Sequence, residues 1–286
     1  MLVREPWVAD RFYPADPEQC RREAERFLNV ASGDGGLPQQ ALGGIVPHAG
    51  WAFSGALTGR VFAYLREHAH PQTLVITGTV HVPEVVYPTT MTMGYWSTPL
   101  GRLEIDCEFA SRLVETGAAE NNPDGHRREH SLEVPLPIAE LAFPDLYLVP
   151  LMVPASVSGV ETGRAVAEVA RSLGRDVLLV ASTDLTHYGP NYRFTPKGVG
   201  VEALRWVKEE NDARVLDAIR RMDAESLVGL ARECKNACGP AATACVLAAA
   251  RELGATQAHV LEYTTSHDVM PRGEPTNFVG YVGAVF

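Results

Sequence analysis

Three histidines in this chain follow closely behind apolar, strand-like runs. His48 comes after Gly-Gly-Ile-Val-Pro, His81 after Leu-Val-Ile-Thr-Gly-Thr-Val, and His187 after Leu-Leu-Val-Ala-Ser-Thr-Asp-Leu-Thr. In open α/β sheets ligands bind outside the carboxyl ends of the strands, so histidines just beyond separate strands can converge in space. Imidazole suits transition metals near neutral pH. The pattern predicts a metal site.

Asp184 precedes His187 by one helical turn of sequence. This spacing can place the carboxylate and the imidazole on one face of a helical turn. Asp184 would then bind the metal, or accept a hydrogen bond that fixes the tautomer of a ligand histidine. The alternative is structural, because Ser182, Thr183 and Asp184 are also residues that cap short turns.

His130 lies in the segment Glu-His-Ser-Leu-Glu, which ends at Glu133. The segment resembles a helix start in which the second glutamate reaches back to the cap. His130 is equally compatible with a place in the ligand pocket, and both interpretations stay open at this point.

Cys238 is the most distinctive thiol, because Asn-Ala-Cys-Gly-Pro leads directly into an Ala-rich helix. The positive end of a helix dipole lowers the pKa of a nearby thiol, which makes it a better ligand or nucleophile. The chain has 5 cysteines, scattered and without a CxxC pair, so we expect reduced thiols rather than disulfides. Cys245, further along the same helix, is expected in the core.

Length and composition favour one soluble domain over residues 1–286, since 46 % hydrophobic residues can build a single core. The net charge of −10 argues against a phosphate-binding surface, and no nucleic-acid partner is expected. No apolar stretch approaches the roughly 20 residues of a membrane span. The charged N-terminus is unlike a secretory signal, so we expect no membrane association and a cytoplasmic location.

Strand and helix patterns alternate along most of the chain. Such alternation predicts an α/β fold with a central mixed, mostly parallel sheet flanked by helices. We expect strands at 42–47, 73–77, 146–151, 176–181, 259–263 and 278–286, and a loop at 33–36. Helices are expected to about residue 28 from an Asp16 cap, and at 54–68, 106–116, 159–173, 197–221, 224–233 and 239–253.

Taken together, the segments resemble the Memo family, known in bacteria and archaea as protein B of the AmmeMemoRadiSam system. The similarity spans essentially the whole chain. It is carried by Phe-Tyr-Pro at 12–14, Pro-His-Ala-Gly at 47–50, Gly-Thr-Val-His at 78–81, Thr-Pro-Leu-Gly at 98–101, Glu-His-Ser-Leu-Glu at 129–133, Ser-Thr-Asp…His-Tyr-Gly at 182–189 and Cys-Gly at 238–239. The resemblance implies a functional association with a radical-SAM protein.

Memo proteins are similar in fold to class III extradiol dioxygenases, which hold iron with two histidines and a carboxylate. Carried onto this sequence, the resemblance implies His48 and His81 as imidazole ligands and Cys238 in the place of the carboxylate. It gives His187 as an acid/base or a further nitrogen ligand, and Asp184 as a residue that lines the site. A thiolate makes the site softer, which favours copper or zinc beside iron.

The first functional hypothesis is a metal-dependent redox enzyme or dioxygenase-like protein that uses Fe or Cu. His187 would shuttle protons, Asp184 would orient it and His130 would lie in the pocket, so these are the candidate catalytic residues. An apolar cavity lined by Trp51, Phe53 and Tyr188 would hold a small-molecule or peptide ligand. The alternatives are a non-catalytic metal- or peptide-binding protein, a zinc-dependent hydrolase, and a metal-free thiol–imidazole pair.

Overall fold

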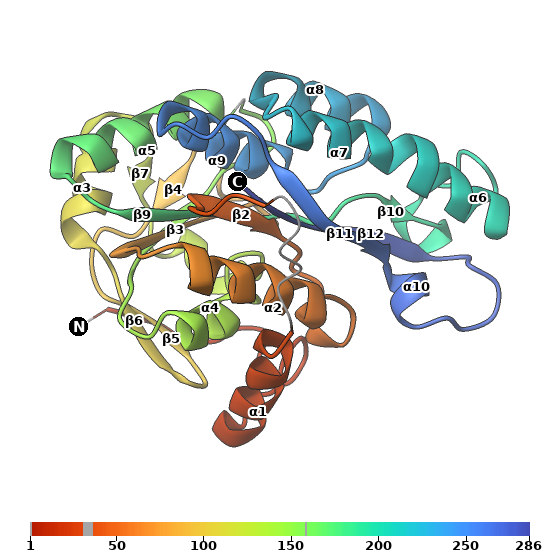
Figure 1. The fold of residues 1–286 in the computed structure, drawn as a ribbon, viewed down its shortest axis with the longest axis horizontal. Helices are drawn as coiled ribbons and strands as arrows, with labels where there is room; N and C mark the ends of the chain where they lie inside the picture. Colours follow the sequence, from red (N-terminus) through yellow and green to blue (C-terminus); the bar gives the residue numbers. More distant parts are fainter. Residues whose placement is uncertain (1, 31–36, 158) are drawn as a thin grey trace.

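The computed structural model describes residues 2–30, 37–157 and 159–286. The chain forms an α/β domain in which one main sheet lies between two layers of helices (Figure 1). The predicted fold class is confirmed. The loop predicted at 33–36 lies outside the described residues.

The centre of the main sheet is parallel and buried. Its strands lie in the order β2 (Gly43–Val46), β9 (Val177–Ser182), β3 (Thr73–Gly78) and β8 (Tyr147–Met152). Ser182 is paired with Val46 on one side and with Gly78 on the other, so β2, β9 and β3 end at the same level. Continuous apolar, β-branched runs are typical of strands covered on both faces. The segments that follow these strands therefore meet at one edge of the sheet.

Antiparallel strands extend the sheet on both sides. β12 (Phe278–Val285) pairs with β2, and it also pairs with β11 (His259–Thr265) and β10 (His187–Tyr188). On the other side β8 pairs with β4 (Thr89–Thr90), which pairs with β7 (Glu120–Asn121). A small separate sheet, which the sequence did not indicate, contains β1 (Val3–Arg4), β5 (Tyr95–Thr98) and β6 (Gly101–Glu104).

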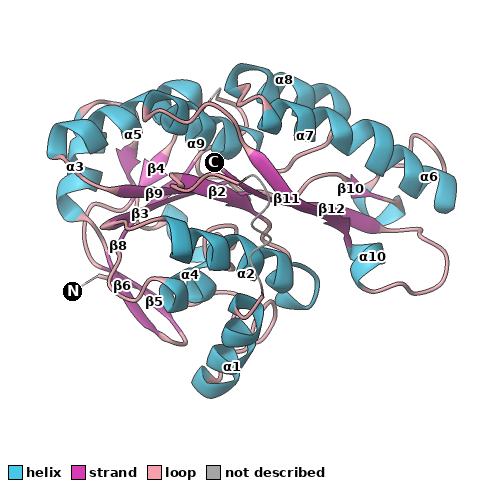
Figure 2. Cartoon of the chain, in the orientation of Figure 1, coloured by secondary structure: helices cyan, strands magenta, loops and turns pink. Residues whose placement is uncertain are grey.

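Helices cover the two faces of the main sheet (Figure 2). One layer contains α1 (Pro17–Leu28), α2 (Trp51–His68) and α4 (Leu136–Ala142). The other contains α3 (Cys107–Glu115), α5 (Val160–Leu173), α7 (Asp212–Arg220), α8 (Ala224–Cys234) and α9 (Pro240–Glu252). Asp16 caps α1 as expected, with its carboxylate accepting from the backbone N–H of Gln19 at 2.8 Å. Within the described ranges, no helix combines the length and the apolar character needed to cross a bilayer.

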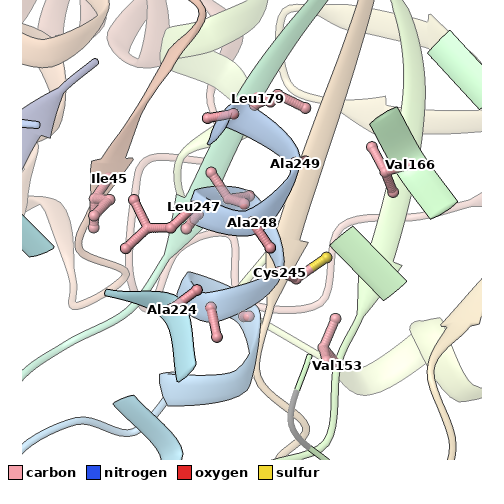
Figure 3. Close-up of a cluster of buried hydrophobic side chains, with 14 of the residues drawn as sticks. Ile45, Val153, Val166, Leu179, Ala224, Cys245, Leu247, Ala248 and Ala249 are labelled. Atoms are coloured by element: carbon pink, nitrogen blue, oxygen red, sulfur yellow. The ribbon is translucent and has the colours of Figure 1, made fainter. Parts of the chain in front are cut away.

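The larger core cluster surrounds α9. Figure 3 shows Leu247 of this helix pointing toward Ile45 of the sheet, while Ala248 and Cys245 lie on the side of α5. Small residues on α9 let the helix lie close to both the sheet and α5. Cys245 is buried in this cluster, as the sequence indicated. The opposite face of the sheet has its own core under α1, α2 and α4.

The helix predicted over 197–221 is shorter and broken. It begins only at Val201, because Gly198 and Gly200 have φ values of 72° and 98°, which lie outside helical geometry. α6 (Val201–Trp206) then passes into a π-helical segment, Val207–Asn211, before α7. Short single-turn helices occur at Gly125–Arg128, Pro190–Tyr192 and α10 (Ser266–Val269).

The helix start predicted at 129–133 is wrong, because the next α-helix, α4, begins at Leu136. Both glutamates of the segment are engaged by residues far away in the sequence. Glu129 accepts from His81, and Glu133 pairs with Arg4 at 2.6 Å. These tertiary contacts replace the local capping hydrogen bonds that the spacing suggested.

Candidate metal centre

His48, His81 and Cys238 converge beyond the carboxyl ends of β2, β9 and β3. One ligand atom from each of them lies within 4.8 Å of the others. His48 follows β2, His81 follows β3, and Cys238 lies in the loop that leads into α9. The aligned ends of the strands thus bring together residues that are widely separated in the sequence.

Hydrogen bonds fix the tautomer of His48. The hydroxyl of Ser182 donates its single proton to the carbonyl oxygen of Ser131 at 2.6 Å. The same hydroxyl lies 3.0 Å from Nδ1 of His48, and it can only accept there. Nδ1 of His48 therefore carries the proton, and the lone pair of Nε2 points toward the sulfur of Cys238 at 3.3 Å. Burial, and then the neighbouring His81, lower the pKa of His48 to about 3, so the ring is neutral at pH 7.

The carboxylate of Glu129 orients the ring of His81 through a hydrogen bond to its Nδ1. This carboxylate accepts from Nδ1 of His81 at 2.8 Å and from the backbone N–H of Ser131 at 2.8 Å. Burial alone would raise the pKa of Glu129, but the hydrogen bonds from His81 and Ser131 outweigh it and bring it to about 2. An ionised carboxylate bonded to Nδ1 leaves Nε2 of His81 free to bind a metal.

The thiol of Cys238 lies among the polar groups of His48, Thr183 and Asp184. Its sulfur accepts from the backbone N–H of Asp184 at 3.2 Å. Burial, and then the Asp184 carboxylate, raise the pKa of the Cys238 thiol in the metal-free protein, so the lowered pKa predicted from the helix dipole is wrong. The amides at the start of α9 are directed elsewhere: Gly239 donates to the hydroxyl of Thr183 and Cys238 to the carbonyl of Asp184.

Asp184 lies against His48. One carboxylate oxygen accepts from the backbone N–H of His48 at 2.9 Å, and the other is 4.0 Å from its Nε2. Burial raises the pKa of Asp184. The helical turn predicted for Asp184 and His187 is wrong, because Leu185 pairs with Gly280 of β12 and holds the segment extended. The alternative, that Asp184 caps a local turn, is also wrong, because its carboxylate accepts from the distant His48.

His130 stacks on His81, with ring centroids 4.3 Å apart and planes 26° apart. It is perpendicular to His48 at 5.5 Å. Burial, and then the neighbouring His48 and His81, lower the pKa of His130 to about 4. His130 is therefore a neutral imidazole at pH 7; it lies outside the group of His48, His81 and Cys238 but forms a second set of possible metal donors with His81 and Glu129.

His187 stands apart from the donor atoms. Its Nδ1 lies 3.1 Å from the carbonyl of Leu185, and its ring packs edge-on against Tyr192 at 5.0 Å. Among the residues that the structure describes, His187 does not join the group of His48, His81 and Cys238. It lines a neighbouring cavity instead, together with Asp184 and His130.

This cavity has a volume of about 500 Å³. Phe12 and Phe53 contribute aromatic walls, so the predicted role of Phe53 agrees with the geometry. Trp51 and Tyr188 do not line it. Trp51 packs against Tyr13 and Phe27, and Tyr188 stacks on Phe278 at 5.0 Å, because each ring points into a core cluster. A larger hollow of about 720 Å³ beside Arg4 and Trp7 includes none of the donor residues.

The groups that hold the donors in place could not be identified from the sequence. In the sequence, Ser182 resembled a residue that caps a short turn, and Glu129 stood in a segment that resembled a helix start. Glu133 accepts from Arg4, from the backbone of Trp7 and Val8 and from the hydroxyl of Tyr13, and so fastens the N-terminal segment to the segment that carries Glu129 and His130. Only the tertiary structure brings these partners together.

Two imidazoles and a thiol form a donor set of intermediate softness. Such sets suit zinc, copper and iron better than calcium or magnesium, which prefer oxygen. His48 presents its unprotonated Nε2 toward the sulfur, and a bound metal ion would displace the thiol proton of Cys238. The residues therefore fit a transition-metal ion.

The fold and the site define an α/β protein with a histidine–cysteine candidate metal centre at the carboxyl edge of its sheet. The profile of the family described as Memo-like protein matches residues 4–285, and the chain belongs to the Memo family. A MEMO1 family protein of Thermococcus onnurineus is 36 % identical, over 100 % of this chain and 99 % of its own length. One from Methanopyrus kandleri is 34 % identical over the same shares.

A solved structure is also similar. The crystal structure of an uncharacterized protein from Escherichia coli K12 aligns with a TM-score of 0.43 and 14 % sequence identity. The alignment covers 80 % of this chain and 91 % of that chain.

Proposed function

We propose that the protein binds a transition-metal ion through Nε2 of His48, Nε2 of His81 and the sulfur of Cys238, and uses it in redox chemistry on a ligand held in the adjacent cavity. The observation that carries this proposal is the pair of Nδ1 contacts. Ser182 and Glu129 each orient an imidazole so that its free nitrogen points to the same place as the thiol.

Iron or copper is the proposed ion. When bound, such an ion supplies electron transfer and polarises a coordinated group. Two imidazoles and one thiolate are fewer ligands than these ions usually take, which leaves room for a ligand from the cavity. The role of the protein is to fix the donors at a site where His48 is buried and His81 is exposed to solvent and to incoming ligands.

Proton transfer is assigned to the imidazoles that line the cavity. His130 is neutral at pH 7, since burial holds its pKa near 4, so it can accept a proton from a bound ligand. His187 lies in the same cavity wall as Asp184. Through-space attraction between Asp184 and His187 opposes the effect of burial on the carboxyl pKa. In this proposal His187 is the second proton carrier and Asp184 orients it.

Hydrolysis at zinc is the second candidate, and the chemistry of the donors favours it. A thiolate with imidazole ligands is a known type of catalytic zinc site. His130 would then take the proton of a metal-activated water. The two candidates differ in the metal that they require.

Metal analysis tests the proposal. The protein is purified anaerobically, and its metal content is measured by elemental analysis beside Cys238→Ala and His48→Ala. Cys107→Ala is the matched control, since this thiol is exposed and far from the donors. Near-stoichiometric iron or copper that only the two site variants lose would support the proposal, and zinc alone would favour hydrolysis. Metal-free protein, or metal retained in both site variants, would overturn it.

A further inference from the structure

A buried polar pair, Asn211 and Asp212, lies behind the candidate metal centre and touches none of its donors. Asn211 closes the π-helical segment Val207–Asn211, and Asp212 opens α7 on the same helical face of the molecule as α8 (Figure 1). The side chains are 2 % and 0 % exposed. π-Helical turns are rare and occur often at functional sites. Here the turn directs two consecutive polar residues into the protein.

Asp212 holds the segment that carries Asp184 and His187. Its Oδ1 accepts from the backbone N–H of Thr186 at 3.2 Å and also from the Thr186 hydroxyl. Its Oδ2 accepts from the hydroxyl of Tyr263 at 2.7 Å. Gly280 of β12 leaves the space that the carboxylate needs, because a Cβ there would lie 2.1 Å from Oδ2.

Asn211 joins that segment to a second one. Its side-chain amide donates to the hydroxyl of Thr186 at 2.9 Å and to the carbonyl of Cys234 at 3.0 Å. The backbone carbonyl of Asn211 accepts from the side-chain amide of Asn236 at 2.8 Å. Cys234 and Asn236 belong to the segment that leads to Cys238. One side chain therefore bonds to both segments that form this part of the site.

The two segments meet again at the donor itself. The backbone N–H of Asp184 donates to the sulfur of Cys238 at 3.2 Å, and the N–H of Cys238 donates to the carbonyl of Asp184 at 3.1 Å. Any slip of one segment past the other would change the position of the sulfur relative to Nε2 of His48. The buried contacts at Asn211 and Asp212 oppose that slip.

We infer that Asn211 and Asp212 are positioning residues that hold the Cys238 segment in register with the Asp184–His187 segment. Buried polar groups are costly when a partner is lost, so such a network specifies one arrangement strongly. The effect on metal binding rests on the proposed function above. The effect on the Cys238 thiol does not, because it concerns the metal-free protein.

The reactivity of the thiol is the first test. Asn211→Ala removes the side-chain bonds to both segments, whereas Tyr263→Phe removes a bond to Asp212 that links neither segment. Both changes are made in a Cys107→Ser background, so that the exposed thiol does not react. The metal-free proteins are treated with Ellman's reagent, and the labelled cysteine is identified by mass spectrometry. We expect Cys238 to react about tenfold faster in Asn211→Ala than in Tyr263→Phe, because losing buried hydrogen bonds lets the two segments open more often and expose the sulfur.

Cobalt binding is the second test. Co²⁺ is titrated into the same proteins, and both the affinity and the thiolate-to-cobalt absorption band are recorded. Asn211→Ala should bind about tenfold more weakly with a shifted band, while Tyr263→Phe, which leaves the bonds of Asn211 and Thr186 in place, should lose much less affinity. Asp212→Asn keeps an acceptor for Thr186 and should restore most of the affinity that Asp212→Leu loses.

The two readouts separate the two proposals. If the background protein binds no Co²⁺, the proposed metal function fails, but the thiol rates still decide the positioning role. Equal Cys238 rates in Asn211→Ala and Tyr263→Phe would overturn that role. Should Asn211→Ala not fold, Thr186→Val replaces it, since Thr186 contacts both Asn211 and Asp212, and the same comparison applies.

Discussion

Nδ1 of His48 lies 3.0 Å from the hydroxyl of Ser182, and that hydroxyl donates to the backbone of Ser131. Because a serine hydroxyl has one proton, the direction of both hydrogen bonds is settled, and with it the tautomer of His48. Ser182, which is not itself a metal donor, thus decides which nitrogen of His48 carries the proton and which one faces Cys238. The arrangement also explains why the thiol is able to donate to Nε2 in the metal-free protein.

Ser182→Ala should weaken metal binding without removing a donor. Loss of the acceptor at Nδ1 frees the imidazole to change its tautomer and to rotate, and supporting contacts of this kind are worth about 10- to 100-fold in metal affinity. The affinity is measured by competition with a chromophoric chelator. Ser172→Ala, on α5, removes a hydroxyl whose one partner among the described residues is the carbonyl of Val169, and it should leave the affinity unchanged. Equal affinities in the two variants would contradict the assigned tautomer.

Metal affinity should rise with pH across the neutral range. Burial raises the pKa of the Cys238 thiol, so the thiol is protonated at pH 7 in the metal-free protein and must release its proton when it binds the ion. Below that pKa the apparent affinity should increase about tenfold per pH unit, since one proton is displaced. Isothermal titrations in buffers of different ionisation enthalpy measure that proton. Release of no proton would show that the sulfur is not a ligand.

Much of the fold could be predicted from the sequence. The buried strands are continuous apolar runs. Because ligands bind at the carboxyl ends of parallel strands, His48 and His81 were predicted at the same edge of the sheet. The rest depends on contacts between distant segments. Glu133 resembled the glutamate of a helix cap, whereas its true partner, Arg4, is far from it in the sequence. Trp51 and Tyr188 stand beside site motifs, but their rings face the core.

The buried His126 should make the free energy of unfolding depend on pH. Burial lowers its folded-state pKa from 6.5 to about 4, so between these values the unfolded chain binds the extra proton. The contribution of the neutral His126 to the free energy of unfolding is fully present above pH 6.5, and it is lost as the pH falls toward 4. The slope is about 1.4 kcal/mol per pH unit. His126→Phe should therefore flatten the curve by that amount in urea titrations from pH 4.5 to 6. Above pH 7.5 the free energies of unfolding of the two proteins should differ by a constant. A constant difference at every pH, down to 4.5, would contradict the lowered pKa of His126.

Two helical glycines should respond in opposite directions to the same substitution. Gly163 on α5 faces α9, where a Cβ would lie 2.1 Å from the carbonyl oxygen of Cys245, so Gly163→Ala must force the two helices apart. Such overpacking costs about 1–3 kcal/mol of unfolding free energy. At Gly229 on α8 a Cβ meets nothing within 4 Å among the described residues. Gly229→Ala should raise stability by about 0.5–1 kcal/mol through helix propensity. Chemical denaturation measures both, and a loss of stability in Gly229→Ala equal to that in Gly163→Ala would show that close contact with α9 is not the cause.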